Sequence, residues 1–186
     1  MIVAVTGLIG AGKTTVCSMF EKERFLVISP DVLGHEVLET HAVKKKLISI
    51  FGVGIVVNGK VVRKQLAAKA FSSSLSRKKL HSITHPLLMR KLKCELQKNK
   101  RKKIIIDVAL FNELGIQKLC DKVVLVRAKK SVREQRLLRN NKFTREQIRM
   151  REQHQSEPSH YDFLIDNNKT KVYTRKQVLL IIRSLH

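Results

Sequence analysis

The sequence contains few of the features that mark disulfide-stapled, zinc-binding or membrane proteins. It has three cysteines, Cys17, Cys94 and Cys120, and none belongs to a C-x-x-C pair or a Cys/His ligand spacing. An odd number of widely spaced cysteines supports neither a disulfide framework nor a zinc site, so we expect reduced, packed thiols. No apolar run approaches the roughly 18 residues of a membrane-spanning helix. No basic leader precedes the first apolar strand, so we expect no signal peptide, no membrane partner and a cytoplasmic location.

Acidic residues are also scarce. There are 38 Lys and Arg residues against 15 Asp and Glu, which gives a formal net charge of +23 at pH 7, and between Val43 and Lys103 the only carboxylate is Glu95. Such an excess predicts an anionic partner, although for each basic cluster the simpler interpretation is a solvated surface. The same segment has only two aromatic residues, Phe51 and Phe71. Stacking on nucleic-acid bases is therefore poorly supported, and a nucleic-acid partner is not expected.

A phosphate-binding loop lies near the N-terminus. The apolar run 2–5 leads into Gly-Leu-Ile-Gly-Ala-Gly-Lys-Thr at residues 7–14, the pattern G-x-x-x-x-G-K-[ST], and a helix-like stretch follows. The glycines let backbone N–H groups turn toward a polyphosphate, Lys13 reaches the outer phosphates and Thr14 offers its hydroxyl to Mg²⁺. The alternative is an ordinary glycine-containing turn. The expected nucleotide-binding residues are Gly7, Gly10, Ala11, Gly12, Lys13, Thr14 and Thr15.

Short apolar runs alternate with helical segments along the chain. We expect strands at about 2–5, 25–28, 104–107, 123–126 and 163–165, and mostly helix between residues 32 and 99 with a turn at Asn58-Gly59. Thr84-His85-Pro86 is expected to begin a helix, and capping boxes are expected at residues 131–134, 144–147 and 174–177. The alternation predicts an α/β fold with a parallel sheet of about five strands flanked by helices. We expect one domain over 1–186, with a core (1–31, 103–135 and 158–186), a helical insertion (about 32–102) and a helical lid (about 136–157).

Two carboxylates follow predicted strands, at the edge of a parallel sheet where ligands bind. We assign Asp31 as the general base that orients an attacking hydroxyl, and Asp107 as the carboxylate that holds Mg²⁺; on these grounds the two roles are interchangeable. An N-cap for the next helix is an equally good interpretation of Asp31.

The predicted lid is rich in arginine. Two helices joined by residues 140–143 carry six arginines, and closure over a γ-phosphate would let two or three of them stabilise the transferring charge and expel water. The alternative is a basic helical surface. The six are Arg133, Arg136, Arg139, Arg145, Arg149 and Arg151.

Several segments, in order, resemble dephospho-CoA kinases. Besides the loop at 5–15, Val27-Ile28-Ser29-Pro30-Asp31 is similar to the family's V-I-D-A-D, and residues 63–66 with Phe71 are similar to its R-x-x-L segment. Residues 85–87 resemble its H-P-L/I segment, residues 107–113 its D-V-P-L-L-F-E, and residues 165–168 its terminal I-D-N-N.

The resemblance implies a kinase that uses Mg²⁺ and ATP to phosphorylate the ribose 3′-hydroxyl of dephospho-CoA, in the last step of coenzyme A synthesis. It places the family's catalytic base on Asp31 and the lid arginines on Arg136 and Arg139. Arg63 and His85 fall in the acceptor-binding part, which makes the helical insertion an acceptor-binding subdomain. We expect a monomer.

Two alternatives stay open at this point. One is another small-molecule kinase of the same architecture, acting on a nucleoside monophosphate or a small alcohol. The other is a basic, nucleic-acid-binding ATPase. A GTPase is disfavoured because the sequence has no N-K-x-D motif.

Overall fold

The structure, a computed structural model, describes residues 1–139, 143–153 and 155–185. The predicted connection at 140–143 falls largely on Asn140–Lys142, which lie outside the described residues. The chain divides into two compact units, one made of Met1–Ser29 and Leu96–His186 and the other of Pro30–Glu95.

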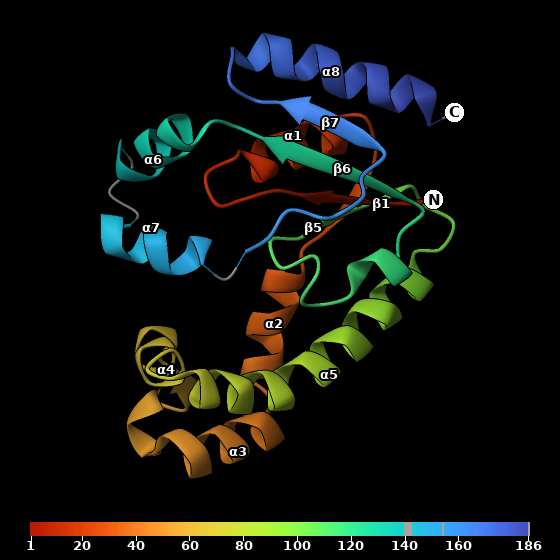
Figure 1. Ribbon diagram of the computed structural model, residues 1–186. Helices are drawn as coiled ribbons and strands as arrows, with labels where there is room; N and C mark the ends of the chain where they lie inside the picture. The colour runs from red at the N-terminus through yellow and green to blue at the C-terminus, as the bar shows by residue number, and fades with distance from the viewer. Residues whose placement is uncertain (140–142, 154, 186) are drawn as a thin grey trace. The chain divides into compact units, whose positions relative to one another are not determined.

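A five-stranded sheet forms the centre of the first unit, and all of its neighbouring strands are parallel (Figure 1). The strand order is β2-β5-β1-β6-β7. The strands are β1 (Ile2–Thr6), β2 (Leu26–Ile28), β5 (Ile104–Asp107), β6 (Lys122–Arg127) and β7 (Phe163–Asp166). The predicted α/β architecture is therefore confirmed.

The register of the sheet places the carboxyl ends of neighbouring strands side by side. Val5 in β1 pairs with Asp107, the last residue of β5, and Arg127 pairs with Asp166 at the ends of β6 and β7. The loop after β1 therefore leaves the sheet at the same edge as the Asp107 carboxylate. Parallel α/β sheets bind their ligands at this edge.

Helices α1 (Lys13–Lys22) and α8 (Lys171–Ser184) cover one face of this sheet (Figure 1). Val16 and Phe20 from α1 pack with Val178 and Ile181 from α8, over alternate residues of the strands. The strands are rich in β-branched residues, whose stiff side chains suit a pleated, buried surface. The lid region contains α6 (Lys130–Arg139) and α7 (Arg145–Glu152), and a short 3₁₀ helix, η2, spans Ile116–Lys118.

The second unit is mainly helical and has its own apolar core. Leu47, Ile55 and Ala70 are fully buried within it. Val56–Val57 and Lys60–Val61 pair as a small antiparallel hairpin around the predicted Asn58-Gly59 turn. The two strands of this hairpin are β3 and β4, in chain order. The helices are α2 (Pro30–Leu38), α3 (His41–Phe51), the 3₁₀ helix η1 (Val53–Ile55), α4 (Arg63–Ala70) and α5 (Ser74–Lys98). The last residues of α5 belong to the first unit.

Several predicted helix starts were wrong. Pro86 lies inside α5 and does not begin a helix. Proline removes one backbone donor, but a 25-residue helix retains its other hydrogen bonds and its packing. The predicted caps at Ser131 and Thr174 lie within α6 and α8, and α8 is instead capped by Thr170, whose hydroxyl accepts from the Tyr173 N–H at 3.3 Å.

The third predicted capping box was right. Thr144 caps α7 and exchanges hydrogen bonds with Gln147.

Every helix in the described ranges is too short or too polar to span a lipid bilayer.

Candidate functional site

The loop between β1 and α1 has the backbone of a phosphate cradle. Gly7, Gly10 and Gly12 all have positive φ values, of 148°, 79° and 98°. At Gly7 a side chain is also excluded by space, since an added Cβ would lie 2.2 Å from the carbonyl oxygen of Val126. The loop therefore lies directly against β6, and the first turn of α1 begins at its end.

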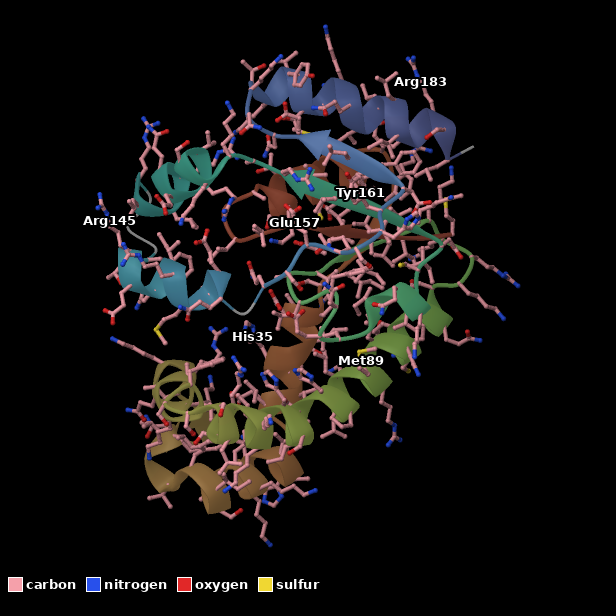
Figure 2. All side chains as sticks on the ribbon, in the orientation of Figure 1. His35, Met89, Arg145, Glu157, Tyr161 and Arg183 are labelled. Carbon is pink, nitrogen blue, oxygen red and sulfur yellow. The ribbon has the colours of Figure 1, made fainter. Side chains whose placement is uncertain are left out.

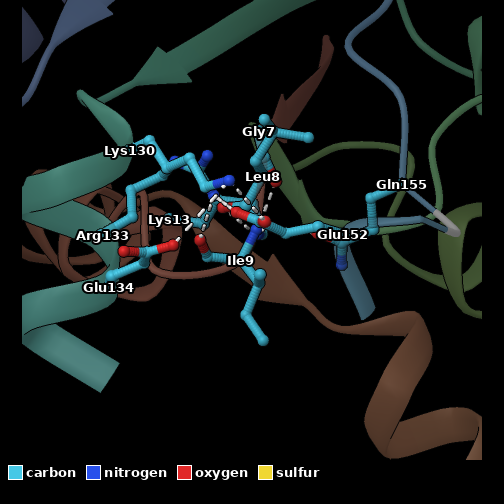
Figure 3. Close-up of polar contacts among 9 residues, drawn as sticks. All are labelled: Gly7, Leu8, Ile9, Lys13, Lys130, Arg133, Glu134, Glu152 and Gln155. Carbon is cyan, nitrogen blue, oxygen red and sulfur yellow. Dashed lines mark hydrogen bonds and ion pairs between the residues drawn. The ribbon is translucent and has the colours of Figure 1, made fainter. Parts of the chain in front are cut away.

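Lys13 and Thr14 occupy the first two positions of α1. The Lys13 ammonium donates to the carbonyl oxygens of Gly7, at 2.7 Å, and Leu8, at 3.4 Å (Figure 3). The side chain thus folds back across the loop that it follows. Thr14 is exposed, and the helix N-terminus at this point favours bound anions.

Asp107 lies next to α1. Burial raises the pKa of the Cys17 thiol well above its usual range, and the neighbouring Asp107 charge raises it further, while Lys13 acts in the opposite direction. Cys17 follows Thr14 by three residues, so both side chains occupy the same face of α1. The Asp107 carboxylate therefore belongs to the same corner of the fold as the phosphate loop.

Thr14 and Asp107 are suitable ligands for Mg²⁺. A hydroxyl and a carboxylate are hard oxygen donors, and kinase sites hold Mg²⁺ through one or two such groups together with substrate phosphates and water. Within the described part of the chain no three His, Cys, Asp or Glu residues form a metal-binding group. A magnesium site here would depend on the nucleotide for most of its ligands.

The lid region is bonded to the middle of the phosphate loop (Figure 3). Gln155 accepts a hydrogen bond from the Ile9 N–H at 2.7 Å, and Arg133 donates to the Ile9 carbonyl at 3.1 Å. The guanidinium of Arg133 also forms a 2.6 Å ion pair with Glu152, and both side chains are largely buried. The backbone N–H and the carbonyl of Ile9 thus both form hydrogen bonds with residues more than 120 positions later in the chain.

The segment after α7 is bonded to the loop that follows β5 and to the end of β6. Asn112 donates to the Ser156 hydroxyl at 2.8 Å, and Arg127, at the end of β6, pairs with Glu157 at 2.6 Å. The hydrogen bonds that Arg127 donates to the Glu157 carboxylate raise the pKa of Arg127. Figure 2 shows Glu157 on the segment that connects α7 to β7. These contacts fix the chain immediately after Gln155.

The predicted lid arginines separate into two groups. Arg136 donates to the Asn167 carbonyl at 2.7 Å and to the Ala11 carbonyl at 3.4 Å, so it lies against the loop. Arg139 is exposed at the end of α6. The arginines of α7 are also exposed, including Arg145 at its start (Figure 2).

The remaining predicted site residues belong to the second unit. Asp31 is the second residue of α2, so it is not the helix N-cap, and His35 follows it on the same helix face. Nη1 of Arg63 lies 2.8 Å from Nε2 of His35, which links α4 to α2. His85 stacks on His81, with ring centroids 4.2 Å apart.

Sequence reasoning did not identify several of these contacts. His35, Glu152 and Gln155 were not candidates, and no local pattern marks them. Asn167 was part of the I-D-N-N match without any assigned role. Its buried side chain donates to the Ala11 carbonyl at 2.7 Å, which is a direct contact with the phosphate loop.

Comparison with known proteins identifies the family. A family model described as dephospho-CoA kinase matches residues 1–172. The chain belongs to the dephospho-CoA kinase family. The match includes the phosphate loop, Asp31, Asp107, the lid and Asn167.

Individual relatives agree with this assignment. The chain is 31% identical to a dephospho-CoA kinase from Geobacillus kaustophilus over 192 residues, covering 98% of this chain and 96% of the relative. It is 37% identical to one from Borreliella burgdorferi over 139 residues, covering 74% and 67% of the two chains. A solved structure of the dephospho-CoA kinase from Campylobacter jejuni shares the fold, with a TM-score of 0.74, 24% identity and coverage of 99% of this chain and 96% of that chain.

Proposed function

We propose that this chain transfers the γ-phosphoryl group of ATP to the ribose 3′-hydroxyl of dephospho-CoA, giving coenzyme A and ADP. The observation that carries the proposal is the family match over residues 1–172, which includes a glycine-rich loop with positive φ angles and a lysine at the start of α1. Action as a cytoplasmic monomer without a nucleic-acid partner remains our expectation from the sequence.

In this proposal the first unit binds and polarises the donor. Phosphoryl transfer depends mainly on positioning and on stabilising charge, because little covalent chemistry is left to the protein. Lys13 neutralises charge on the outer phosphates, and the loop N–H groups bind the polyphosphate. Thr14 and Asp107 would hold Mg²⁺, which would supply further positive charge at the transferring group.

The lid residues shield the reacting group from water. Arg136 already contacts the loop through the Ala11 carbonyl, and we propose that it stabilises charge on the transferring phosphoryl. Arg139 is proposed to join it when the lid closes. Exclusion of water favours transfer to the alcohol over hydrolysis.

The second unit supplies the acceptor side. We propose that Asp31 accepts the proton of the 3′-hydroxyl during an in-line attack, and that Arg63 and His85 contribute to acceptor binding. Arg63 is a cation suited to the acceptor's phosphates, and its contact with His35 supports a preformed position.

An acceptor panel tests the proposed activity. Purified protein is incubated with Mg-ATP and dephospho-CoA, AMP, CMP or shikimate, and the products are separated by mass. We expect phosphorylation of dephospho-CoA and at most trace product from the others. Preferential phosphorylation of AMP, CMP or shikimate would identify a different small-molecule kinase, and polynucleotide-stimulated ATP hydrolysis without product would indicate a nucleic-acid-dependent ATPase.

The role of Asp31 has its own test. In Asp31→Asn the side-chain volume is kept and proton acceptance is lost, so we expect kcat to fall by about 10²- to 10⁴-fold with ATP affinity unchanged. Lys13→Ala is the contrasting variant, because it removes a phosphate contact and should weaken both ATP binding and turnover. A kcat near that of wild type in Asp31→Asn would show that this carboxylate is not the base.

A further inference from the structure

Asn167 lies at the end of β7 and is held by four hydrogen bonds. Its backbone N–H donates to the Arg127 carbonyl at 2.8 Å, which continues the sheet one residue beyond the strand. Its side chain is buried, with the amide oxygen accepting from the Thr174 hydroxyl at 2.8 Å and the amide nitrogen donating to Ala11 at 2.7 Å. Its backbone carbonyl accepts from Arg136.

The Asn167 amide lies between the Ala11 carbonyl on one side and the Thr174 hydroxyl on the other. Thr174 is fully buried on α8, and its hydroxyl has a second contact with the Thr170 carbonyl at 3.2 Å. The Ala11 carbonyl can only accept a hydrogen bond, so the NH₂ group of Asn167 faces the loop and its amide oxygen faces Thr174 on α8. The Thr174 hydroxyl, which lies outside the phosphate loop, supports this orientation by donating to the amide oxygen.

The acceptor of this NH₂ group belongs to a peptide that matters for anion binding. The carbonyl of Ala11 and the N–H of Gly12 are parts of one peptide unit. In a planar trans peptide the C=O and N–H bonds point in opposite directions. A donor that holds the Ala11 oxygen on one side therefore directs the Gly12 N–H to the other side.

The space around Gly12 shows how closely Asn167 approaches. A Cβ added at Gly12 would lie 2.1 Å from the Asn167 amide nitrogen, and Gly12 has φ 98° in the left-handed region. Gly12 is the N-cap of α1, directly before Lys13. The amide of Asn167 therefore packs on the backbone where the phosphate loop joins α1. Arg136 donates a second hydrogen bond to the Ala11 carbonyl, at 3.4 Å.

From these contacts we propose that Asn167 is a positioning residue for nucleotide binding, which sets the orientation of the Ala11–Gly12 peptide so that its N–H is directed to the phosphates of ATP. In this proposal Asn167 acts through the loop, without contacting the base or the acceptor. The inference rests on the proposed function only in taking ATP as the ligand.

The test compares binding of two ligands by calorimetry. Mg-ATP and Mg-tripolyphosphate are titrated into wild type, Asn167→Ala, Asn167→Asp and Thr174→Val. We expect the dissociation constants of both ligands to rise about tenfold in Asn167→Ala, and at least as much in Asn167→Asp, whose carboxylate cannot donate to the Ala11 carbonyl. Thr174→Val keeps the donor to Ala11 but removes the hydrogen bond to the amide oxygen, so its effect should be smaller.

Asn168→Ala is the matched control. Asn168 is the next residue, and its side chain accepts from the Lys129 N–H at 2.7 Å without contacting the phosphate loop. Its dissociation constants should stay within about twofold of wild type. In steady-state assays, Asn167→Ala should raise KM for ATP and leave KM for the acceptor unchanged, a split that general loss of stability would not produce.

The outcomes separate the two proposals. Unchanged tripolyphosphate and ATP binding in folded Asn167→Ala would overturn the positioning role, and a loss confined to ATP would show that Asn167 contacts the nucleoside instead. If Asn167→Ala does not fold, Asn167→Asp and Thr174→Val give the same comparison. Failure of wild type to phosphorylate dephospho-CoA would reject the proposed acceptor, while the calorimetric comparison would still decide the role of Asn167.

Discussion

Cys17 packs where the phosphate loop, α1 and β5 meet, and its chemistry reflects that position. Burial is the main cause of its raised pKa, and the Asp107 charge adds to it. Burial also raises the pKa of Cys120 to about 11, with a further contribution from Asp121. Cys94, by contrast, is exposed on α5. Only a thiolate reacts readily with disulfide reagents, so the three thiols should differ sharply in rate.

We expect a fast reaction of a single thiol with Ellman's reagent at pH 8. For a pKa of about 11 only about one thiol in a thousand is ionised at that pH, and burial hinders Cys17 as well. The fast phase should disappear in Cys94→Ser, and all three thiols should react in denaturant. A fast phase that survives in Cys94→Ser would contradict the packing described for Cys17 or Cys120.

At the scale of elements, one contact joins the beginnings of β6 and β7. The Asp162 carboxylate accepts hydrogen bonds from the Lys122 ammonium at 2.8 Å and from the Val123 N–H at 2.9 Å. Desolvation alone would raise the pKa of Asp162, but these donors outweigh it, and the pKa lies below the ordinary value of 3.8. The ionised carboxylate therefore stabilises the folded chain.

The pH dependence of stability tests this contact. A lowered folded-state pKa gives stability that is fully present above the unfolded pKa and is lost as the pH falls through the folded value. We expect Asp162→Asn to lower the free energy of unfolding by about 0.5 to 1 kcal/mol at pH 7, and the difference from wild type to shrink below about pH 4. Urea titrations of both proteins at pH 7 and pH 3 measure this difference in the free energy of unfolding. An equal difference at both pH values would contradict a stabilising role of the ionised Asp162 carboxylate.

The lid elements owe their position to contacts that are distant in sequence. Arg133 from α6 pairs with Glu152 from α7, and its Nε has no hydrogen-bond partner among the described residues. Removal of one member of a buried ion pair leaves an uncompensated charge, which is strongly destabilising. Glu152 therefore matters for keeping α7, and with it Gln155, against Ile9.

The strands and the phosphate loop were predictable because their signals are local. The apolar run at 104–106 followed by Asp107 defines β5, and the glycine spacing at 7–12 dictates the loop. Helix starts were less predictable, since Thr174 has the sequence of a cap but is buried one turn inside α8. Gln155 was not predictable at all: its partner Ile9 lies 146 residues earlier, and only the folded sheet brings them together.

At the scale of the whole molecule, the charge of +23 lies largely on side chains that face solvent. On α3, Lys45 and Lys46 are exposed while Val43 and Leu47 are buried, and on α5 Lys78 and Lys79 are exposed. This pattern agrees with the solvated-surface interpretation of the basic clusters. Family membership rests instead on the match of the family model to residues 1–172.

The proposed reaction is tested most directly by the position and stoichiometry of the phosphate that the protein transfers. Dephospho-CoA and Mg-ATP are incubated with the wild-type chain, with Lys13→Ala as the control, and the product is examined by mass spectrometry and ³¹P NMR. We expect one ADP for each product molecule, with the new phosphate on the ribose 3′-oxygen, and much less product from Lys13→Ala. Release of ADP without a phosphorylated dephospho-CoA, or phosphorylation at another position, would contradict the proposed reaction.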